Sequence, residues 1–402
     1  MDSNLSVMKK ILTVLLVLAV AGGGAFAQGW TFSGLVDGGL GITITDDDNQ
    51  FGESSSVVPV STASTDGMRT QMDANFVSDD ANMGLSFRVR VDGWGTAGAG
   101  GLGQGAGFSH AFGWLSFAEN MVRVYGGRLD AIGRLAAGNT LDRMTDGVSN
   151  GWGAGLFTII EPVQNLQFGL GAMTAGEAVL TGTHTSTNPH AMGSFFVSYL
   201  EPDLFRVTAG IRNQSNVEAV SQAYFSFSYL GLADMHIAAT ARFRNLEEFG
   251  DEGIISFYAS FGHTGLVDGL DLRLGAAIGL HQDSDADPWM WFTAGVNYTL
   301  TDTIVPRLHL HYVSGGVWGG FNWNTLALTA SGRLHTNALR DGATFFDDHQ
   351  FFQIRPSVQI RITGASFVEL GCVFHMNIGD AQTWRSGDNM DMLLYALVRV
   401  AF

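Results

Sequence analysis

The chain has 402 residues, a formal net charge of −17 and a mildly positive mean hydropathy of +0.15. This acidic excess argues against binding to nucleic acids and against docking on anionic lipid, and the single Cys372 excludes an internal disulfide. No stretch after the N-terminal region approaches the 18 consecutive apolar residues of a transmembrane helix. The 53 glycines and only 7 prolines instead fit many strands joined by tight turns.

The N-terminal 27 residues have the three parts of a secretory signal peptide. Two lysines form a charged start, Ile11 to Val20 is an apolar run, and Ala25 to Ala27 supplies a small-x-small cleavage site. A transmembrane helix is the alternative, but Gly22 to Gly24 break the run before it reaches the roughly 20 residues needed to cross a bilayer. We therefore expect residues 1–27 to be cleaved and residues 28–402 to form a single domain.

Four segments of the remaining chain alternate between apolar and polar or small residues with a period of two. They are Met83 to Val91, Met235 to Phe243, Leu270 to Leu280 and Phe352 to Ile362. A period of two indicates β-strands, and each run is about as long as the 9–11 residues that a tilted strand needs to cross a bilayer. A soluble β-sandwich also alternates, but strands in globular proteins are usually shorter, at ~5–6 residues.

The connections between the expected strands alternate in length. The short connections contain turn-forming residues and are residues 78–82, 119–120, 161–165, 201–203, 231–234, 301–303 and 363–365. The long connections are residues 45–66, 95–106, 130–149, 175–189, 282–287 and 379–389. A turn near Ala330 to Gly332 would split Phe321 to Arg340 into two strands and give about 20 strands in all; without it the number would be odd. The sequence thus predicts an all-β, transmembrane, antiparallel up-and-down β-barrel of about 18–20 strands, and 16 is also allowed.

The last eleven residues, Met392 to Phe402, alternate in the same way and finish on an aromatic residue. The apolar register faces one way, while Arg399 lies on the other. A buried arginine is expensive in an ordinary core but is tolerable where that face meets water. This strand resembles the closing strand of bacterial outer-membrane β-barrels, which ends in Phe and is read by the barrel-assembly machinery. The resemblance implies a location in the cell outer membrane, short turns toward the periplasm, and an assembly signal formed by Phe402, Val400, Val398 and Leu394.

Arginines fall repeatedly on the face opposite the apolar register. A lipid-facing arginine at the bilayer midplane costs roughly 2–4 kcal/mol in a barrel, so ten of them pointing outward would exceed any plausible stability. We therefore expect them to line the lumen. The ten residues are Arg88, Arg90, Arg206, Arg212, Arg242, Arg244, Arg273, Arg355, Arg361 and Arg399.

These features together predict a porin-like channel for the passive diffusion of small hydrophilic solutes, filtered by an arginine-lined lumen. One hypothesis is that loop carboxylates face the arginines and form a constriction, and Asp130 to Ser149 has the place in chain order of the constriction loop in general porins. The alternative is that such pairs fill a closed lumen. A surface adhesin or receptor with ligand-binding loops, and a transporter of hydrophobic substrates, are the rival functions. The resemblance also implies outer-membrane lipid around the barrel and a homo-trimer as one form of assembly.

Catalytic, cofactor and metal chemistry find little support in the sequence. No Ser, His and Asp residues show a hydrolase context, and the glycine-rich Gly98 to Gly107 lacks the Lys-Ser/Thr of a phosphate loop. His309 and His311, two apart on one strand face, could share a metal, but no third ligand at a defined spacing is visible. We expect a protein that is not an enzyme and that has no cofactor and no metal.

Overall fold

The computed structural model describes most of the chain after the N-terminal region. The described residues are 29–44, 55–61, 68–92, 106–130, 152–174, 191–214, 220–244, 246, 249–282, 288–317, 345–363, 365–377 and 390–402. The predicted signal peptide therefore lies outside them. Among the described residues, no helix has the length and hydropathy that spanning a membrane would require.

Nearly all of the described residues belong to β-strands. The strands are β1 (Trp30–Ile44), β2 (Ser55–Val60), β3 (Met68–Val77), β4 (Met83–Asp92), β5 (Ala106–Phe117), β6 (Val122–Asp130), β7 (Trp152–Val163), β8 (Leu166–Thr174), β9 (Ala191–Glu201), β10 (Phe205–Gln214), β11 (Val220–Tyr229), β12 (Met235–Arg244), β13 (Ile254–His263), β14 (Leu270–His281), β15 (Trp289–Tyr298), β16 (Ile304–Val317), β17 (Phe345–Arg361), β18 (Phe367–Asn377) and β19 (Met390–Ala401). A single helical turn, α4 (Phe249–Glu252), precedes β13. The predicted all-β class is confirmed.

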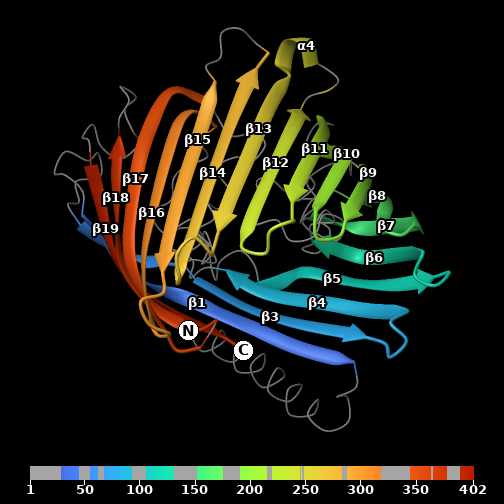
Figure 1. Ribbon diagram of the computed structural model, residues 1–402, viewed down its shortest axis with the longest axis horizontal. Helices are drawn as coiled ribbons and strands as arrows, with labels where there is room; N and C mark the ends of the chain where they lie inside the picture. The colour runs from blue at the N-terminus through green and yellow to red at the C-terminus, as the bar shows by residue number, and fades with distance from the viewer. Residues whose placement is uncertain are drawn as a thin grey trace.

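The strands form one antiparallel sheet that closes on itself (Figure 1). Each strand from β3 to β18 pairs with the next strand along the chain, and β19 pairs with β1 to complete the ring. On its other side β1 pairs with β2 through residues 39–44 and with β3 through residues 30–38. Because β2 and β3 share one position, the barrel has 18 strand positions, within the predicted range and even in number.

One part of the chain-order prediction is wrong. The predicted long connection of residues 45–66 contains the six-residue strand β2 (Ser55–Val60), which pairs with the second half of β1. Its sequence Ser-Ser-Val-Val-Pro-Val shows no alternation, and it includes a proline, which argues against a strand because proline has no backbone N–H to donate. The register with β1 makes it a strand, because the open half of β1 would otherwise present unpaired backbone groups. The segment Phe321 to Arg340, on which the count of 20 depended, lies outside the described residues.

Most of the short connections are confirmed as tight turns between neighbouring strands, but β7 runs to Val163, into the predicted connection 161–165, and residue 364 of the last connection lies outside the described residues. Backbone hydrogen bonds close them, as from Ala81 N to Ser78 O and from Leu204 N to Glu201 O. Asn120, Asn165 and Asp203 take the left-handed backbone conformation in three of them, and Asn and Asp tolerate this conformation better than most residues.

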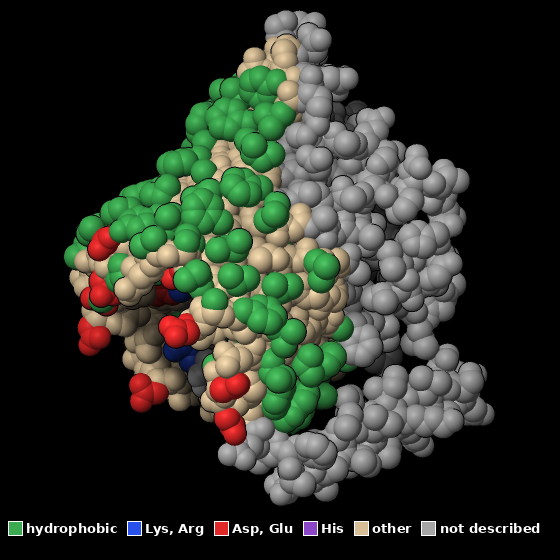
Figure 2. Space-filling view, turned by 90° about the vertical axis from the view of Figure 1, so that its right-hand side faces the viewer, with side chains coloured by type: hydrophobic (Ala, Val, Ile, Leu, Met, Phe, Trp, Pro, Cys, Tyr) green, Lys and Arg blue, Asp and Glu red, His purple; other side chains and the backbone are tan. Residues whose placement is uncertain are grey.

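The two faces of the sheet differ as the alternation predicts. Leu85, Ile237, Leu274 and Leu370 are exposed on the outside, while the residues that alternate with them are mostly buried or half-buried. Figure 2 shows hydrophobic side chains over much of the described outer surface, with Asp and Glu side chains gathered along one edge. An apolar outer belt with polar residues at its rim is the surface that a barrel presents to a bilayer.

Glycines opposite aromatic rings are a repeated feature of the strand register. In each case the ring belongs to the residue paired directly with the glycine, and a Cβ built on the glycine would lie within 2.6 Å of a ring atom or ring hydroxyl. The rings therefore lie across the neighbouring strand, where only a glycine leaves room for them. Within the described strands these pairs include Gly84 with Trp114, Gly169 with Phe196, Gly171 with Phe157, Gly210 with Tyr224 and Gly371 with Tyr395.

A glycine opposite an aromatic ring also occurs at the seam of the barrel, where β1 meets β19. Gly34 and Phe402 exchange two backbone hydrogen bonds, of 2.8 and 3.1 Å, and the Phe402 ring lies over Gly34. The last residue of the chain thereby extends the pairing of β19 with β1 beyond Ala401. The ring itself stays 70% exposed, so it covers the seam from outside.

Replacing Gly34 with alanine should weaken the closure of the barrel. The new Cβ would lie 2.2 Å from Cζ of Phe402, so the exposed ring must swing away from Gly34 and lose its packing over the seam, at a cost of about 1 kcal/mol. The midpoint of thermal unfolding in detergent, followed by heat-dependent migration on gels, measures the loss. Gly250→Ala is the matched control, because a Cβ added there would have nothing within 4 Å. Equal behaviour of the two variants would contradict the role given to the seam.

The turn between β3 and β4 gives a prediction on pH. Asp80 accepts hydrogen bonds from Ser78 Oγ (2.6 Å), the Asn82 backbone N (3.1 Å) and Asn82 Nδ2 (2.9 Å). The Ser78 hydroxyl above all lowers the pKa of the exposed Asp80 below its usual 3.8. The turn is therefore stabilised above the ordinary pKa, and this stabilisation is lost as the pH falls through the lowered value. Titration by NMR in micelles should show the lowered pKa and its return toward 3.8 in Ser78→Ala; an unchanged pKa in that variant would refute the cause.

Candidate functional site

The inner face of the barrel carries the charged residues on which a channel function would depend. Seven of the ten predicted arginines have described side chains, and all seven lie in the register opposite the exposed apolar residues: Arg88, Arg206, Arg242, Arg273, Arg355, Arg361 and Arg399. The side chains of Arg90, Arg212 and Arg244 lie outside the described residues. That these arginines line a path for solutes stays a prediction.

A buried ionic cluster joins β16, β17, β18 and β19. Both oxygens of Glu369 are engaged: Arg355 Nη2 donates to Oε1 at 2.7 Å, and Arg307 Nη1 donates to Oε2 at 2.9 Å. The Tyr395 hydroxyl also donates to Oε1 at 2.8 Å and accepts a hydrogen bond from Arg355 Nε at 2.7 Å. All four side chains are at most 5% exposed, so this cluster ties four strands together in a region of low dielectric.

The side-chain amides of Asn297 and Gln359 extend this cluster to neighbouring residues. Arg307 Nε donates to Asn297 Oδ1 at 2.7 Å, and Gln359 Nε2 donates to Glu369 Oε2 at 3.2 Å. Asn297 Nδ2 in turn lies 3.4 Å from Asp271, which accepts a bidentate pair of hydrogen bonds from Arg273. A connected polar surface therefore runs from β14 to β19 on the inner face.

Two further ion pairs lie near the seam. Arg88 on β4 forms an ion pair with Asp73 on the neighbouring strand β3. Arg399 Nε donates a hydrogen bond to Asp37 Oδ2 at 2.8 Å across the β1–β19 pairing. Asp37 is fully buried and also accepts a hydrogen bond from Ser61. Both arginines thus pair with carboxylates on strands, whereas we expected carboxylates from loops. The predicted constriction segment from Asp130 to Ser149 lies, beyond Asp130 itself, outside the described residues.

Sequence reasoning missed Asp37, Asp73, Arg307 and Tyr395. The strands that hold the two aspartates carry many small and polar residues, so their alternation is weak. A polar residue paired with an arginine can be recognised only after the register is known. Tyr395 had a usable signal, since it lies on the same register of the C-terminal strand as Arg399.

A different inner surface lies about halfway round the ring from the charged one. Over β6 to β11 the large buried inner residues are mostly aromatic, namely Tyr125, Phe157, Phe196 and Tyr224, and smaller polar residues such as Ser198 and Thr208 are buried with them. Phe157 and Phe196 stack with their ring centroids 5.8 Å apart. The inner face thus has an aromatic side and an ionic side.

The predicted outward-facing residues of the C-terminal strand lie as expected. Leu394, Val398 and Val400 are each 44–46% exposed, and Phe402 closes the seam. Their reading by an assembly machinery stays a prediction.

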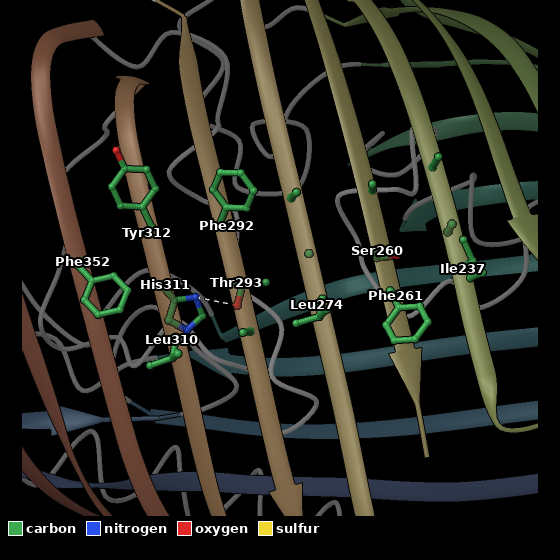
Figure 3. Close-up of a pocket in the computed structure, with 16 residues that line it drawn as sticks. Ile237, Ser260, Phe261, Leu274, Phe292, Thr293, Leu310, His311, Tyr312 and Phe352 are labelled. Atoms are coloured by element: carbon green, nitrogen blue, oxygen red, sulfur yellow. Dashed lines mark hydrogen bonds between the residues drawn. The ribbon is translucent and has the colours of Figure 1, made fainter. Parts of the chain in front are cut away.

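An apolar hollow of about 560 Å³ crosses β12 to β17. Figure 3 shows Phe292, Tyr312 and Phe352 around it, with Leu274 and Phe261 toward its other end. These residues belong to the exposed apolar register, so the hollow lies on the outer, lipid-facing surface and offers no polar chemistry. His311 also lines the hollow, although it belongs to the inner-face register, and its Nδ1 lies at hydrogen-bond distance, 2.9 Å, from Thr293 Oγ1. No group of three or more metal-ligating side chains occurs among the described residues.

Comparisons with known proteins identify the architecture. A scan against protein-family models and a search of curated proteins found no match. Among solved structures, the chain is similar to a BenF-like porin from Pseudomonas fluorescens Pf-5, with a TM-score of 0.55 and 10% identity over 93% of this chain and 98% of that one. Pseudomonas aeruginosa OccK11 (OpdR) gives a TM-score of 0.50 at 10% identity over 93% and 98%, and OccD3 (OpdP) gives 0.50 at 11% over 93% and 91%.

At these identities the likeness concerns the fold. The closed barrel, the apolar outer belt and the similar structures agree with one another. The chain therefore has the porin-like fold of bacterial outer-membrane β-barrels, and it is a protein of the outer membrane.

Proposed function

We propose that the protein is a channel through which small hydrophilic solutes diffuse passively across the outer membrane, filtered by the charge of its inner wall. The observation that carries the proposal is the combination of 18 strand positions with a connected ionic surface on the inner face. Barrels of 16–18 strands are wide enough to leave an aqueous channel, whereas barrels of about 8 strands fill with side chains.

The charged inner wall supports filtering by charge. Ionisable residues in a membrane-spanning segment are rare and mark solute or ion pathways, and rings of charged side chains set the preference of a pore. Here the partly exposed Arg273 and Asp271 lie two residues apart on β14. The similar protein from Pseudomonas fluorescens is a BenF-like porin, which is consistent with the proposal.

Export and assembly form part of the same proposal. Residues 1–27 would direct secretion and be removed, and the barrel-assembly machinery would read the C-terminal strand that ends in Phe402. A homo-trimer would be one form of the assembled channel. Neither an enzymatic activity nor a cofactor is proposed.

Conductance in a planar lipid bilayer tests the channel. The purified protein should give discrete current steps whose size grows with salt concentration. A silent protein that is folded by heat-dependent gel migration would overturn the proposal and favour an adhesin or receptor barrel with a filled lumen.

The Arg273–Asp271 pair gives a sharper test of filtering. Arg273→Gln should shift the ion preference toward cations, and Asp271→Asn should shift it toward anions, because each removes one charge from the same part of the wall. Exposed charges contribute about 1 kcal/mol or less, so the permeability ratio should change by up to about fivefold. Reversal potentials in a salt gradient measure both variants, and each serves as the control for the other. Shifts of the same sign, or none, would take this pair out of the conduction path.

A further inference from the structure

The outer face of the barrel is hollowed where it meets the bilayer. The apolar hollow of about 560 Å³ across β12 to β17 opens among residues of the exposed register, such as Leu274 and Phe292 (Figure 3). Ser260, Thr293 and His311 also line it, from the inner-face register. Apolar cavities stay dry, and an empty cavity forfeits the van der Waals contacts of its walls. An apolar group should therefore fill this hollow in the membrane.

The hollow exists because small residues meet in the strand register. Ala239 on β12 pairs with Ala259 on β13, and Ala259 pairs with Ala276 on β14. All three belong to the outward register, so three methyl groups lie side by side on the lipid-facing surface. The same row continues over the next three strands with aromatic residues, namely Phe292, Tyr312 and Phe352. The surface is therefore low over β12 to β14 and is bounded by rings over β15 to β17.

The extent of the hollow corresponds to one leaflet of a bilayer. It crosses the six neighbouring strands β12 to β17, which at a spacing of ~4.8 Å cover about 24 Å. Strands of outer-membrane barrels are tilted by about 35–45°, so a row across them covers about 15 Å of the membrane depth. The hydrocarbon core is about 30 Å thick, and half of it is the depth that one acyl chain occupies.

The hollow is continuous with the apolar belt that faces the bilayer. Its walls are themselves part of that belt, since Phe292 is 50% exposed and Leu274 is 43% exposed. Acyl chains therefore reach the hollow without leaving the membrane. Two proteins in a bilayer gain little from burying apolar surface against each other, because lipid tails are equally apolar. This surface therefore favours a lipid chain over a second copy of the protein.

The charge at one end of these strands discriminates between lipid head groups. Three long connections join the strands of the hollow in pairs, and the connections after β12 and β14 contain neither lysine nor arginine. Their seven acidic residues are Glu247, Glu248, Asp251, Glu252, Asp283, Asp285 and Asp287. Acidic segments repel an anionic head group, whereas a zwitterionic head group brings its own ammonium charge.

We propose that the hollow is a binding site for one acyl chain of a zwitterionic phospholipid, which lies along Ala239, Ala259 and Ala276 and packs against the ring of Phe292. The site goes beyond the proposed function, because it lies on the outer face and does not depend on conduction. Its lipid would stay with the protein when the remaining lipid is exchanged for detergent.

Native mass spectrometry of the purified full-length protein in detergent tests the site. Phosphatidylethanolamine is the probe, and phosphatidylglycerol with the same acyl chains is the anionic comparison. We expect one phosphatidylethanolamine per chain to be retained at detergent concentrations that strip further lipids. Retention of no lipid would overturn the proposal, and retention of phosphatidylglycerol equal to that of phosphatidylethanolamine would overturn the choice of lipid.

Two variants that fill the hollow locate the lipid. Ala259→Phe and Ala276→Leu each place a larger apolar side chain in the row of alanines, and each should lower lipid occupancy about tenfold, because the contacts available to the acyl chain are lost. Ala209→Phe is the matched control, because Ala209 is an exposed, outward-facing alanine on β10, outside the hollow. Equal occupancy in Ala259→Phe and Ala209→Phe would refute the assignment. Ala276→Leu decides the question if Ala259→Phe does not fold.

The same spectra separate the lipid from a second copy of the chain. A protein that retains no lipid and forms an oligomer that Ala259→Phe dissociates would overturn the proposal and assign the hollow to contact between copies. Lipid retention by a protein that conducts no current would uphold the site and refute the channel. Conductance without retained lipid would do the reverse.

Discussion

Closure of the hydrogen-bonded sheet between β1 and β19 is the constraint on which the rest of this structure depends. A sheet edge in hydrocarbon leaves backbone N–H and C=O groups without partners, and water is not there to replace them. The seam is therefore paired from Leu35 with Ala401 to Ile44 with Met392, extended by Phe402 over Gly34, and reinforced by Arg399 with Asp37. The same requirement explains the short strand β2, because β2 supplies hydrogen-bond partners to the half of β1 that β3 does not reach.

Closure also decides where charge can be placed. Once the outer face meets lipid, arginines must lie inside, where each requires a carboxylate or water. The Glu369 cluster shows how demanding this is, because one carboxylate serves two guanidiniums and a tyrosine. Removing one partner of a buried ion pair typically costs about 3–5 kcal/mol. Such a cluster is therefore weak evidence for stability.

Much of the architecture could be predicted from residue patterns. The alternation in Leu270 to Leu280 and in Phe352 to Ile362 gave the strand positions and their outward faces, because lipid and the barrel interior impose opposite polarities on successive residues. The short turns could be predicted from their turn-forming residues, because a turn depends on the backbone preferences of a few adjacent residues. The strand β2 escaped prediction, because its pairing with β1 depends on a partner beyond a long connection and not on its own sequence.

The candidate site was predictable only in part. The alternation of apolar and polar residues predicted that Arg355 lies on the inner face. Its partners Glu369 and Tyr395 could not be predicted, because they lie on β18 and β19 and come close to Arg355 only in the register of those strands. His309 and His311 were expected to be an ordinary polar pair and not a metal site, but only the register shows that His309 lies opposite the guanidinium of Arg355.

The sequence by itself determined the class of fold, the faces of the strands and the turns, because these follow from interactions between residues a few positions apart. The tertiary structure decided the strand number, the glycine–ring pairs and which charges meet, because a register is set by strand pairing and ring closure. Shifting that register by one residue would move every side chain of a strand to the other face.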